Sequence, residues 1–206
     1  MRVLVPFGAD DPKRRLAPVF DADERREFAE AMLADVLAAL DAHEPVVVSN
    51  APVDVEAAVS VDERPLTEAV NAELAAGTPA AVVMADLPLV TPAAVARLFE
   101  SDADVVVAPG LGGGTNALVV RHPSFRTDYH GASVRDHRRA ARDLDASLTT
   151  VDSFRLAVDA DEPADLVEIL LHGEGLTASW LRERGARVET TDGRARFRLD
   201  GRGKDS

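Results

Sequence analysis

One carboxylate stands at the end of a short apolar run, in the segment AAVVMADLPLV over residues 80–90. The run stops at Asp86, and Pro88 follows, a residue that interrupts regular structure. This pattern predicts a buried strand that carries Asp86 at its exposed end. Because ligands of open α/β sheets bind at the carboxyl ends of the strands, we expect the acid to face a binding site.

Two further acids, Asp159 and Asp161 in AVDADEPADL, end another candidate strand later in the chain. They lie two residues apart, so their side chains face the same way on an extended chain. Carboxylates from separate strand ends favour a divalent-metal site, because Mg²⁺ takes oxygen ligands and is usually held by one or two carboxylates together with substrate phosphates. The structural alternative is that Asp161 caps a helix that opens at Pro163.

Three cations, Lys13, Arg14 and Arg15, follow the first predicted strand in the loop GADDPKRRLAP. Beside the carboxyl end of a strand they would suit a polyphosphate, with Lys as a point charge and Arg as a bidentate donor. The alternative is a solvated basic loop that balances Asp10 and Asp11. The loop is not a Walker motif, since GxxxxGK[ST] occurs nowhere in the chain.

Glycines are clamped between two apolar segments in APGLGGGTNALVV, residues 108–120. This favours a tight loop whose backbone approaches an anion, with the hydroxyl of Thr115 nearby, although a plain connecting turn is the alternative. The segment TDYHGASVRDH places Gly131 and Ser133 at an expected helix N-terminus, a natural seat for a phosphate or carboxylate. Ser133 could equally serve as an N-cap alone.

Nucleophilic catalysis finds little support in the sequence. The chain has no Cys and no GxSxG motif, and its histidines lack HExxH or comparable ligand spacing. We expect each of them to be a surface or partly buried residue. The five are His43, His122, His130, His137 and His172.

Short apolar runs alternate with stretches of helical period, which predicts βαβ units and a mostly parallel sheet. The expected strands are residues 2–6, 46–49, 80–85, 105–108, 117–120 and 148–151. The clearest helix spans about residues 23–42, with Asp21 and Glu24 spaced as a capping box. Further helices are expected near Thr67, Thr91, Ser133 and Pro163.

The length and the 46% hydrophobic content suit one domain over residues 1–206. From about residue 174 the chain changes character and is expected to form an appendage. It would contain a short helix around 179–184, an edge strand in RARFRLD and a frayed end, GRGKDS.

The net charge of -13 and the scarcity of Lys, which occurs only at positions 13 and 204, argue against nonspecific nucleic-acid binding. They favour a halophilic source, since strong salt screens self-repulsion. The N-terminus does not read as a signal peptide, and no run approaches the length of a membrane-spanning helix. We therefore expect a cytoplasmic protein without a membrane partner.

Taken together, VPFGADDPKRRLAPVFDADERREFAEAML, MADLPLV, APGLGGGTNALVV, YHGASVRDH and VDADEPADLVEILLHGEG resemble the 2-phospho-L-lactate guanylyltransferase family of coenzyme F420 biosynthesis. The resemblance covers nearly the whole chain. It implies a Rossmann-like nucleotidyltransferase domain of three α/β/α layers. The implied reaction joins GTP to 2-phospho-L-lactate and releases pyrophosphate and lactyl-2-diphospho-5'-guanosine. Relatives also suggest a homodimer.

The resemblance also implies roles for matching residues. Mg²⁺ is expected on Asp86, Asp159 and Asp161. Lys13 is expected at the GTP phosphates, with Arg14 or Arg15 supplying further charge. Thr115, Gly131 and Ser133 are expected to receive the phosphate and carboxylate of the acceptor.

Gly8 and Thr67 depart from the family pattern, and the residues that read guanine stay unassigned.

Two other kinds of protein remain open at this stage. The first is another nucleotidyltransferase of the same fold with phosphoenolpyruvate or 3-phosphoglycerate as the acceptor, since such small differences change binding by only about 1 to 3 kcal/mol. The second is a nucleotide-sensing module without catalysis. It would bind nucleotide tightly but release no pyrophosphate in the presence of Mg²⁺.

Overall fold

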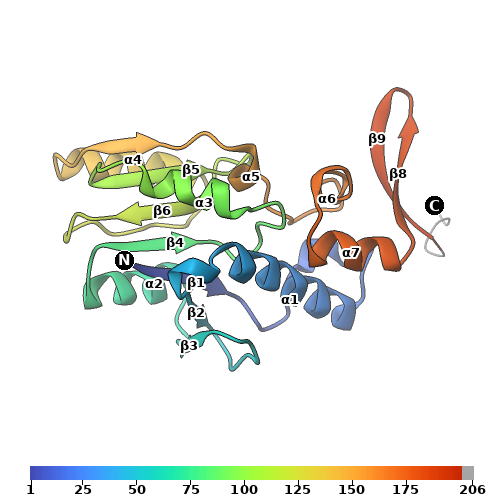
Figure 1. The fold of residues 1–206 in the computed structure, drawn as a ribbon, viewed down its shortest axis with the longest axis horizontal. Coiled ribbons are helices and arrows are strands. Elements are labelled where there is room, and N and C mark those ends of the chain that lie inside the picture. Colours follow the sequence, from blue (N-terminus) through green and yellow to red (C-terminus); the bar gives the residue numbers. More distant parts are fainter. Residues whose placement is uncertain (201–206) are drawn as a thin grey trace.

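The computed structural model describes residues 1–200, which are built around a seven-stranded sheet (Figure 1). The strands lie in the order β3-β2-β1-β4-β6-β5-β7. Their bounds are β1 Arg2–Phe7, β2 Val46–Ser49, β3 Ala58–Val61, β4 Ala80–Val83, β5 Val105–Pro109, β6 Thr115–Val120 and β7 Leu148–Thr150. Within this seven-stranded sheet only β6 runs antiparallel to its neighbours, so the predicted mostly parallel sheet is confirmed.

The central strands are apolar on both faces because helices cover both sides of the sheet. Val3 and Val5 of β1 point into one core and Leu4 into the other, and all three side chains are fully buried. The helices are α1 Ala22–Ala39, α2 Leu66–Ala76, α3 Pro92–Phe99, α4 Ser133–Asp143, α5 Phe154–Ala157, α6 Leu166–His172 and α7 Leu176–Glu183.

The helices divide between the two cores, which gives three layers. Helices α1, α3, α5, α6 and α7 contribute to the first core, whereas α2 and α4 contribute to the second (Figure 1). The three-layer α/β/α architecture predicted from the sequence is therefore confirmed. None of the helices within residues 1–200 is both long and apolar enough to cross a membrane.

Local sequence signals correctly predicted where several helices begin. Helix α1 begins as predicted, since the side chain of Asp21 accepts from the backbone N–H of Glu24 while Glu24 accepts from that of Asp21. Helix α3 begins after Thr91, whose hydroxyl accepts from the N–H of Ala94. Strand β3 was not predicted, because an edge strand of mixed polarity lacks the apolar run that marks the buried strands.

The helix after the acidic pair differs from the prediction. It begins at Leu166 rather than at Pro163. The carboxylate of Asp165 accepts from the backbone N–H groups of Asp161 (2.9 Å) and Glu162 (2.7 Å) and so fixes the turn before the helix. The alternative in which Asp161 caps this helix is therefore wrong, and its carboxylate instead contacts Lys13 and Arg15.

The last part of the described chain packs on α1 and then extends away from the main sheet (Figure 1). The carboxylate of Asp35 in α1 accepts from the first N–H groups of α7, and Trp180 lies against Phe20 and Phe28. Strands β8 (Ala186–Thr191) and β9 (Arg194–Leu199) then form a separate two-stranded sheet. The predicted strand near the end thus exists, but it pairs with β8 rather than with the edge of the main sheet. The expected frayed end, 201–206, lies outside the described residues.

Candidate active site at the carboxyl ends of β1 and β4

The loop after β1 holds Lys13 in an unusual backbone conformation. Lys13 has φ of 53° and Asp11 has φ of 42°, both in the left-handed region that residues with a side chain rarely adopt. Arg25 of α1 stabilises this loop, since its guanidinium donates to the Asp11 carboxylate (2.7 Å) and to the carbonyl of Pro12 (3.3 Å). The Arg25 side chain is 10% exposed, so a buried cation maintains the strained loop.

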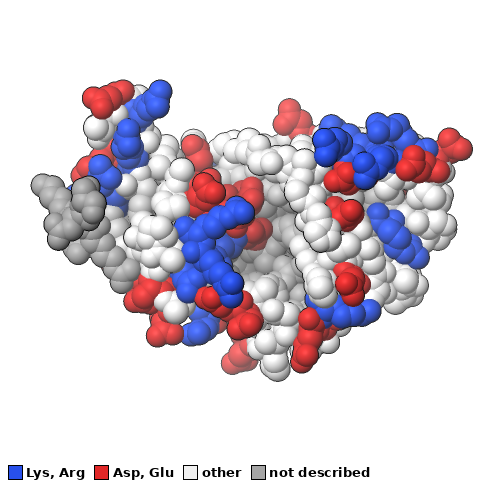
Figure 2. Space-filling model, turned by 180° about the vertical axis from the view of Figure 1, so that it is seen from behind, with Lys and Arg blue, Asp and Glu red and all other residues white. Residues whose placement is uncertain are grey.

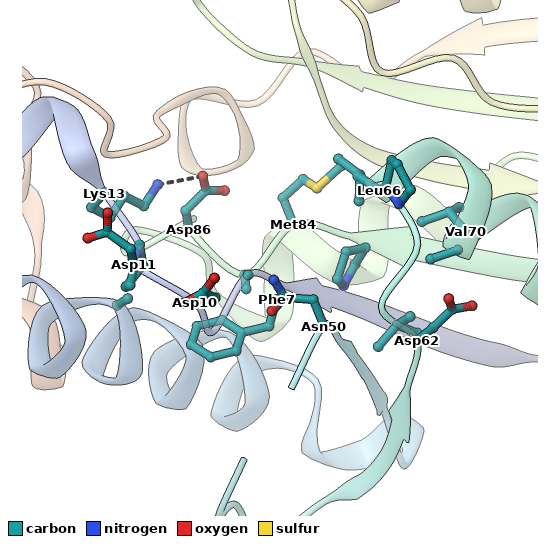
Figure 3. A pocket seen from close by; sticks show the side chains of 18 of the residues that line it. Phe7, Asp10, Asp11, Lys13, Asn50, Asp62, Leu66, Val70, Met84 and Asp86 are labelled. Carbon is teal, nitrogen blue, oxygen red and sulfur yellow. Dashed lines mark hydrogen bonds and ion pairs between the residues drawn. The ribbon is translucent and has the colours of Figure 1, made fainter. Parts of the chain in front are cut away.

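Lys13 joins two of the predicted metal ligands. Its ammonium group lies 2.7 Å from an oxygen of Asp86 and 2.8 Å from an oxygen of Asp161 (Figure 3 draws the contact with Asp86). Lys13 and Asp86 meet because β1 and β4 are parallel neighbours, so the segments that follow them emerge at the same edge of the sheet. The prediction that Asp159 and Asp161 end a strand is wrong, because they follow the short helix α5. Their segment reaches the site through a hydrogen bond from the backbone N–H of Ala160 to the carbonyl of Asp86 (3.2 Å). Burial lowers the pKa of Lys13, but the two carboxylates more than offset this effect, and the net pKa lies above its ordinary value.

The two arginines of the loop differ in position. Arg15 lies 3.7 Å from Asp161 and 3.9 Å from Glu162, at the edge of the acidic group. Arg14 instead donates to Asp11 at 2.7 Å, and its side chain is 77% exposed. The structure therefore brings Lys13 and Arg15 to the carboxylates, whereas Arg14 stays beside them on the loop.

Asp159 lies close to the same group but is held by β6. The side-chain amide of Asn116 donates to Asp159 (3.4 Å) and to the carbonyls of Leu156 (3.0 Å) and Ala157 (3.3 Å). Burial raises the pKa of Asp159, and the negative charges of Asp86 and Asp161 raise it further. A carboxylate in this environment is stabilised by any cation that joins the group.

The donor set fits a hard divalent cation. Asp86, Asp159 and Asp161 offer carboxylate oxygens, and the one ammonium group of Lys13 contacts only Asp86 and Asp161 among them. Among the residues that the structure describes, no group of three or more His, Asp or Glu side chains is arranged so that it could hold a metal ion by itself. Mg²⁺ does not require one, because it is commonly held by one or two carboxylates and completed by water and substrate phosphates.

A cavity of about 690 Å³ opens beside Lys13, within the usual size range of small-molecule sites. Figure 3 shows Phe7, Asn50, Leu66 and Met84 around it, with Asp86 on its border. Its lining combines apolar side chains with Asp62 and Arg64. This mixture suits a ligand with a flat apolar part and polar edges, with its charged end toward Lys13.

The predicted acceptor residues form a second group, apart from this cavity. The hydroxyl of Ser133 lies 3.2 Å from that of Thr115, and the two side chains belong to nearly buried residues that are 2% and 3% exposed. Gly131 is exposed and has φ of 59°. None of the three lines the 690 Å³ cavity. Ser133 is the first residue of α4, and its hydroxyl contacts Thr115 rather than capping the helix.

The sequence prediction for one histidine is wrong. His137 is fully buried, and its Nδ1 lies 2.9 Å from the hydroxyl of Thr115. The spacing from Ser133 to His137 is a helical i, i+4 pair, which places both on one face of α4. That spacing was the available signal, but only the packing against β6 shows that the face is buried.

Burial of His137 makes the stability of the protein depend on pH. Burial lowers the pKa of His137 from 6.5 to about 4, against the opposing effect of Asp128 and Asp136. Between these values the unfolded chain binds a proton that the folded chain does not, so the free energy of unfolding falls as the pH falls. Between pH 7.5 and pH 5 we expect wild type to lose about 2 kcal/mol more than a His137→Asn variant does.

Chemical denaturation of both proteins at the two pH values checks this expectation. Asp128 faces His137, but its pKa lies below its ordinary value, mainly through the hydrogen bond with His130, so this carboxylate stays ionised over the pH range. The difference between the two proteins therefore reports His137. Parallel losses of stability in wild type and variant would show that His137 becomes protonated in the folded state as readily as in the unfolded chain.

The surface carries both signs of charge despite the acidic composition. Figure 2 shows basic side chains in small groups interleaved with acidic ones on one face, which is hollowed near its middle. Such mixed groups agree with the exposed ion pairs of the described residues, of which Arg26 with Asp23 and Arg187 with Glu189 are examples.

Comparison with known proteins gives a consistent result over nearly the whole chain. A family model described as guanylyl transferase, CofC like, matches residues 1–202. A 2-phospho-L-lactate guanylyltransferase of Haloferax volcanii is 65% identical over 94% of this chain and 96% of its own length. The protein of the same name from Halomicrobium mukohataei is 60% identical over 94% and 97%. The acidic composition agrees with these halophilic relatives.

Solved structures support the fold. A nucleotide-diphospho-sugar transferase structure from Desulfovibrio desulfuricans has a TM-score of 0.71 and 15% identity, with 90% of this chain and 96% of that chain covered. A 2-C-methyl-D-erythritol 4-phosphate cytidylyltransferase from Thermus thermophilus has a TM-score of 0.54 and 18% identity, with 88% and 98% covered. At such low identities these two structures show only that the α/β architecture is shared.

Proposed function

The chain belongs to the family of CofC-like guanylyl transferases, and we propose that it transfers the guanylyl group of GTP to 2-phospho-L-lactate. A phosphate oxygen of the acceptor attacks the α-phosphorus of GTP and forms a new P–O–P linkage. The bond from the α-phosphorus to the oxygen that bridges to the β-phosphate breaks, and pyrophosphate leaves with that oxygen. The other product is lactyl-2-diphospho-5'-guanosine, an intermediate of coenzyme F420 synthesis.

One observation carries the proposal at the level of the site. Lys13 lies between Asp86 and Asp161 at the border of a cavity large enough for a nucleotide. A triphosphate that enters the cavity would exchange the carboxylate contacts of Lys13 for contacts with phosphate oxygens. A site of this kind combines a cation for the leaving group with carboxylates for a metal, which are the parts that phosphoryl-group chemistry requires.

The residues act mainly by position and charge. The acceptor phosphate is already ionised at neutral pH, so no general base is required to create the nucleophile. Lys13 would neutralise charge that develops on the departing pyrophosphate, and Arg15 would add a second cation from the edge of the site. Arg14 is exposed and would contact the outer phosphates of the nucleotide.

Asp86, Asp159 and Asp161 would hold Mg²⁺ at this site. When bound, the ion would polarise the α-phosphate and offset negative charge between the two anionic substrates. Asn116 would keep Asp159 oriented through the amide contact described above. A homodimer and a cytoplasmic location are part of the proposal as well, and a halophilic source agrees with the organisms of the relatives.

Pyrophosphate release measures the proposed reaction directly. The purified protein would be assayed in molar salt with Mg²⁺, with GTP, ATP, CTP or UTP as donor. Each donor would be combined with 2-phospho-L-lactate, phosphoenolpyruvate or 3-phosphoglycerate as acceptor. We expect GTP with 2-phospho-L-lactate to give the highest kcat/KM. A higher kcat/KM with another acceptor would identify that compound as the substrate in place of 2-phospho-L-lactate. Tight GTP binding without pyrophosphate release would favour a sensing module.

A further inference from the structure

A chain of polar contacts runs through the second core and ends at the Thr115–Ser133 pair. The backbone N–H of Asp128 donates to Nε2 of His137 at 3.0 Å. On the other side of the ring, Nδ1 lies 2.9 Å from the hydroxyl oxygen of Thr115. The ring of His137 lies edge-on against Tyr129, with 5.2 Å between centroids, so packing fixes its orientation.

These contacts determine which ring nitrogen carries the proton. Nε2 accepts a hydrogen bond from a backbone N–H, and it therefore has no proton of its own. The ring is neutral at pH 7, because burial lowers its pKa to about 4. A neutral imidazole has one N–H, which must then be on Nδ1. His137 consequently donates to the hydroxyl oxygen of Thr115.

The number of hydrogens in the group decides what it can offer to a ligand. The group contains three, the Nδ1–H and the two hydroxyl hydrogens, and the two contacts within it use two of them. One hydroxyl hydrogen therefore remains, whichever of Thr115 and Ser133 donates to the other. With the opposite tautomer Nδ1 would accept from Thr115, Thr115 would accept from Ser133, and no hydrogen would remain.

We propose that His137 is a positioning residue that makes the Thr115–Ser133 pair a hydrogen-bond donor toward the anionic acceptor. The inference rests on the proposed function, in which this pair receives the phosphate or carboxylate of the phospho-acid. A hydroxyl that can donate stabilises an anion, whereas a pair that presents only lone pairs repels it. His137 would thus affect binding of the acceptor without touching the acceptor itself.

The structure also places the proposed ligand at a defined location. Thr115 follows the glycine loop 110–114, and Ser133 follows Gly131, so both hydroxyls lie beneath loops with exposed backbone. The two loops meet where the N–H of Val134 donates to the carbonyl of Gly113 at 3.3 Å. Since Thr115 and Ser133 are almost fully buried, the acceptor would reach the remaining hydroxyl hydrogen only when these loops separate.

The tautomer of His137 is measurable in the free protein. Nitrogen-15 NMR of histidine-labelled protein at pH 7 distinguishes the Nδ1–H from the Nε2–H form, and the His137 signals are assigned by their loss in a His137→Asn variant. We expect the Nδ1–H form. An Nε2–H ring, or a ring that is charged at pH 7, would overturn the inference.

Three substitutions at His137 separate donation to Thr115 from packing. His137→Asn places an amide where Nδ1 lies, so it can still donate to Thr115. His137→Gln reaches toward the N–H of Asp128 but has no donor at Thr115, and His137→Leu keeps apolar volume alone. We expect the Gln and Leu variants to raise the KM for the phospho-acid about 10-fold to 100-fold, with the KM for GTP little changed. The Asn variant should recover most of the loss.

The outcomes have distinct meanings. Equal losses for both substrates in the Gln and Leu variants, or an Asn variant no better than the Gln variant, would overturn the inference. His122→Asn serves as the control, because His122 lies outside the network and its Nδ1 accepts from the N–H of Ser124. Melting curves verify that each variant is folded, and the comparison of Asn with Gln remains decisive if the Leu variant is not. If the wild-type protein is inactive with all of the acceptors, the proposed function is refuted, and the inference with it.

Discussion

An Asp86→Asn variant should release pyrophosphate at least about 10²-fold to 10³-fold more slowly than wild type, with little change in its melting temperature. The substitution keeps the shape of the side chain but removes one charge from the group of three carboxylates. It also weakens the contact with Lys13, which lies 2.7 Å away. The fold should persist, since the side chain is 30% exposed and contributes little to core packing.

The loss of activity should depend on where the negative charge is removed rather than on the change in net charge. Asp159→Asn and Asp161→Asn should reduce the rate in a similar way. Asp102→Asn is a matched control, because Asp102 is exposed and precedes β5, at the opposite edge of the sheet. Activity of the Asp86 variant within a few-fold of wild type would remove Asp86 from the site, whatever the control shows. Unlike a helix cap, Asp161 is not expected to affect stability through α6, because Asp165 fixes that turn.

A Lys13→Met variant should lose activity while it binds Mg²⁺ more tightly than wild type. The loss, about 10²-fold to 10³-fold in kcat/KM for GTP, follows from removal of the cation expected at the leaving group. The tighter Mg²⁺ binding is expected because the ammonium group of Lys13 contacts oxygens of Asp86 and Asp161 that a metal would otherwise use. Removal of this competitor leaves the carboxylates unpaired and so favours a divalent cation.

Titration calorimetry with Mg²⁺ and steady-state kinetics with varied GTP measure the two effects on the same protein. Arg26→Met removes one positive charge from an exposed pair with Asp23 and controls for the change in net charge. Weaker Mg²⁺ binding in the Lys13 variant would mean that Lys13 orients the carboxylates for the metal rather than competing with it. Unchanged kcat/KM would exclude Lys13 from contact with the triphosphate.

The sequence by itself determined the architecture and the candidates for chemistry. Apolar runs of strand length between amphipathic stretches are local signals, and they predicted a mostly parallel sheet because strands buried on both faces have no polar side. The capping box at Asp21 and Glu24 fixed the start of α1 in the same local way. Asp86 and the basic loop could be singled out because charged residues that directly follow a buried strand seldom serve core packing.

Only the tertiary structure decided which of these residues meet. Lys13 and Asp161 are 148 residues apart in the chain, and they touch because the sheet order brings the ends of separate segments to one edge. Arg25 and His137 were not predicted as parts of the site, since the sequence shows a charged residue on a helix but not what buries it. Thr115 and Ser133 pair with each other outside the cavity at Lys13, a contact that the sequence did not predict. Periodicity reports the local environment of a residue, whereas contacts between polar side chains depend on how distant elements pack.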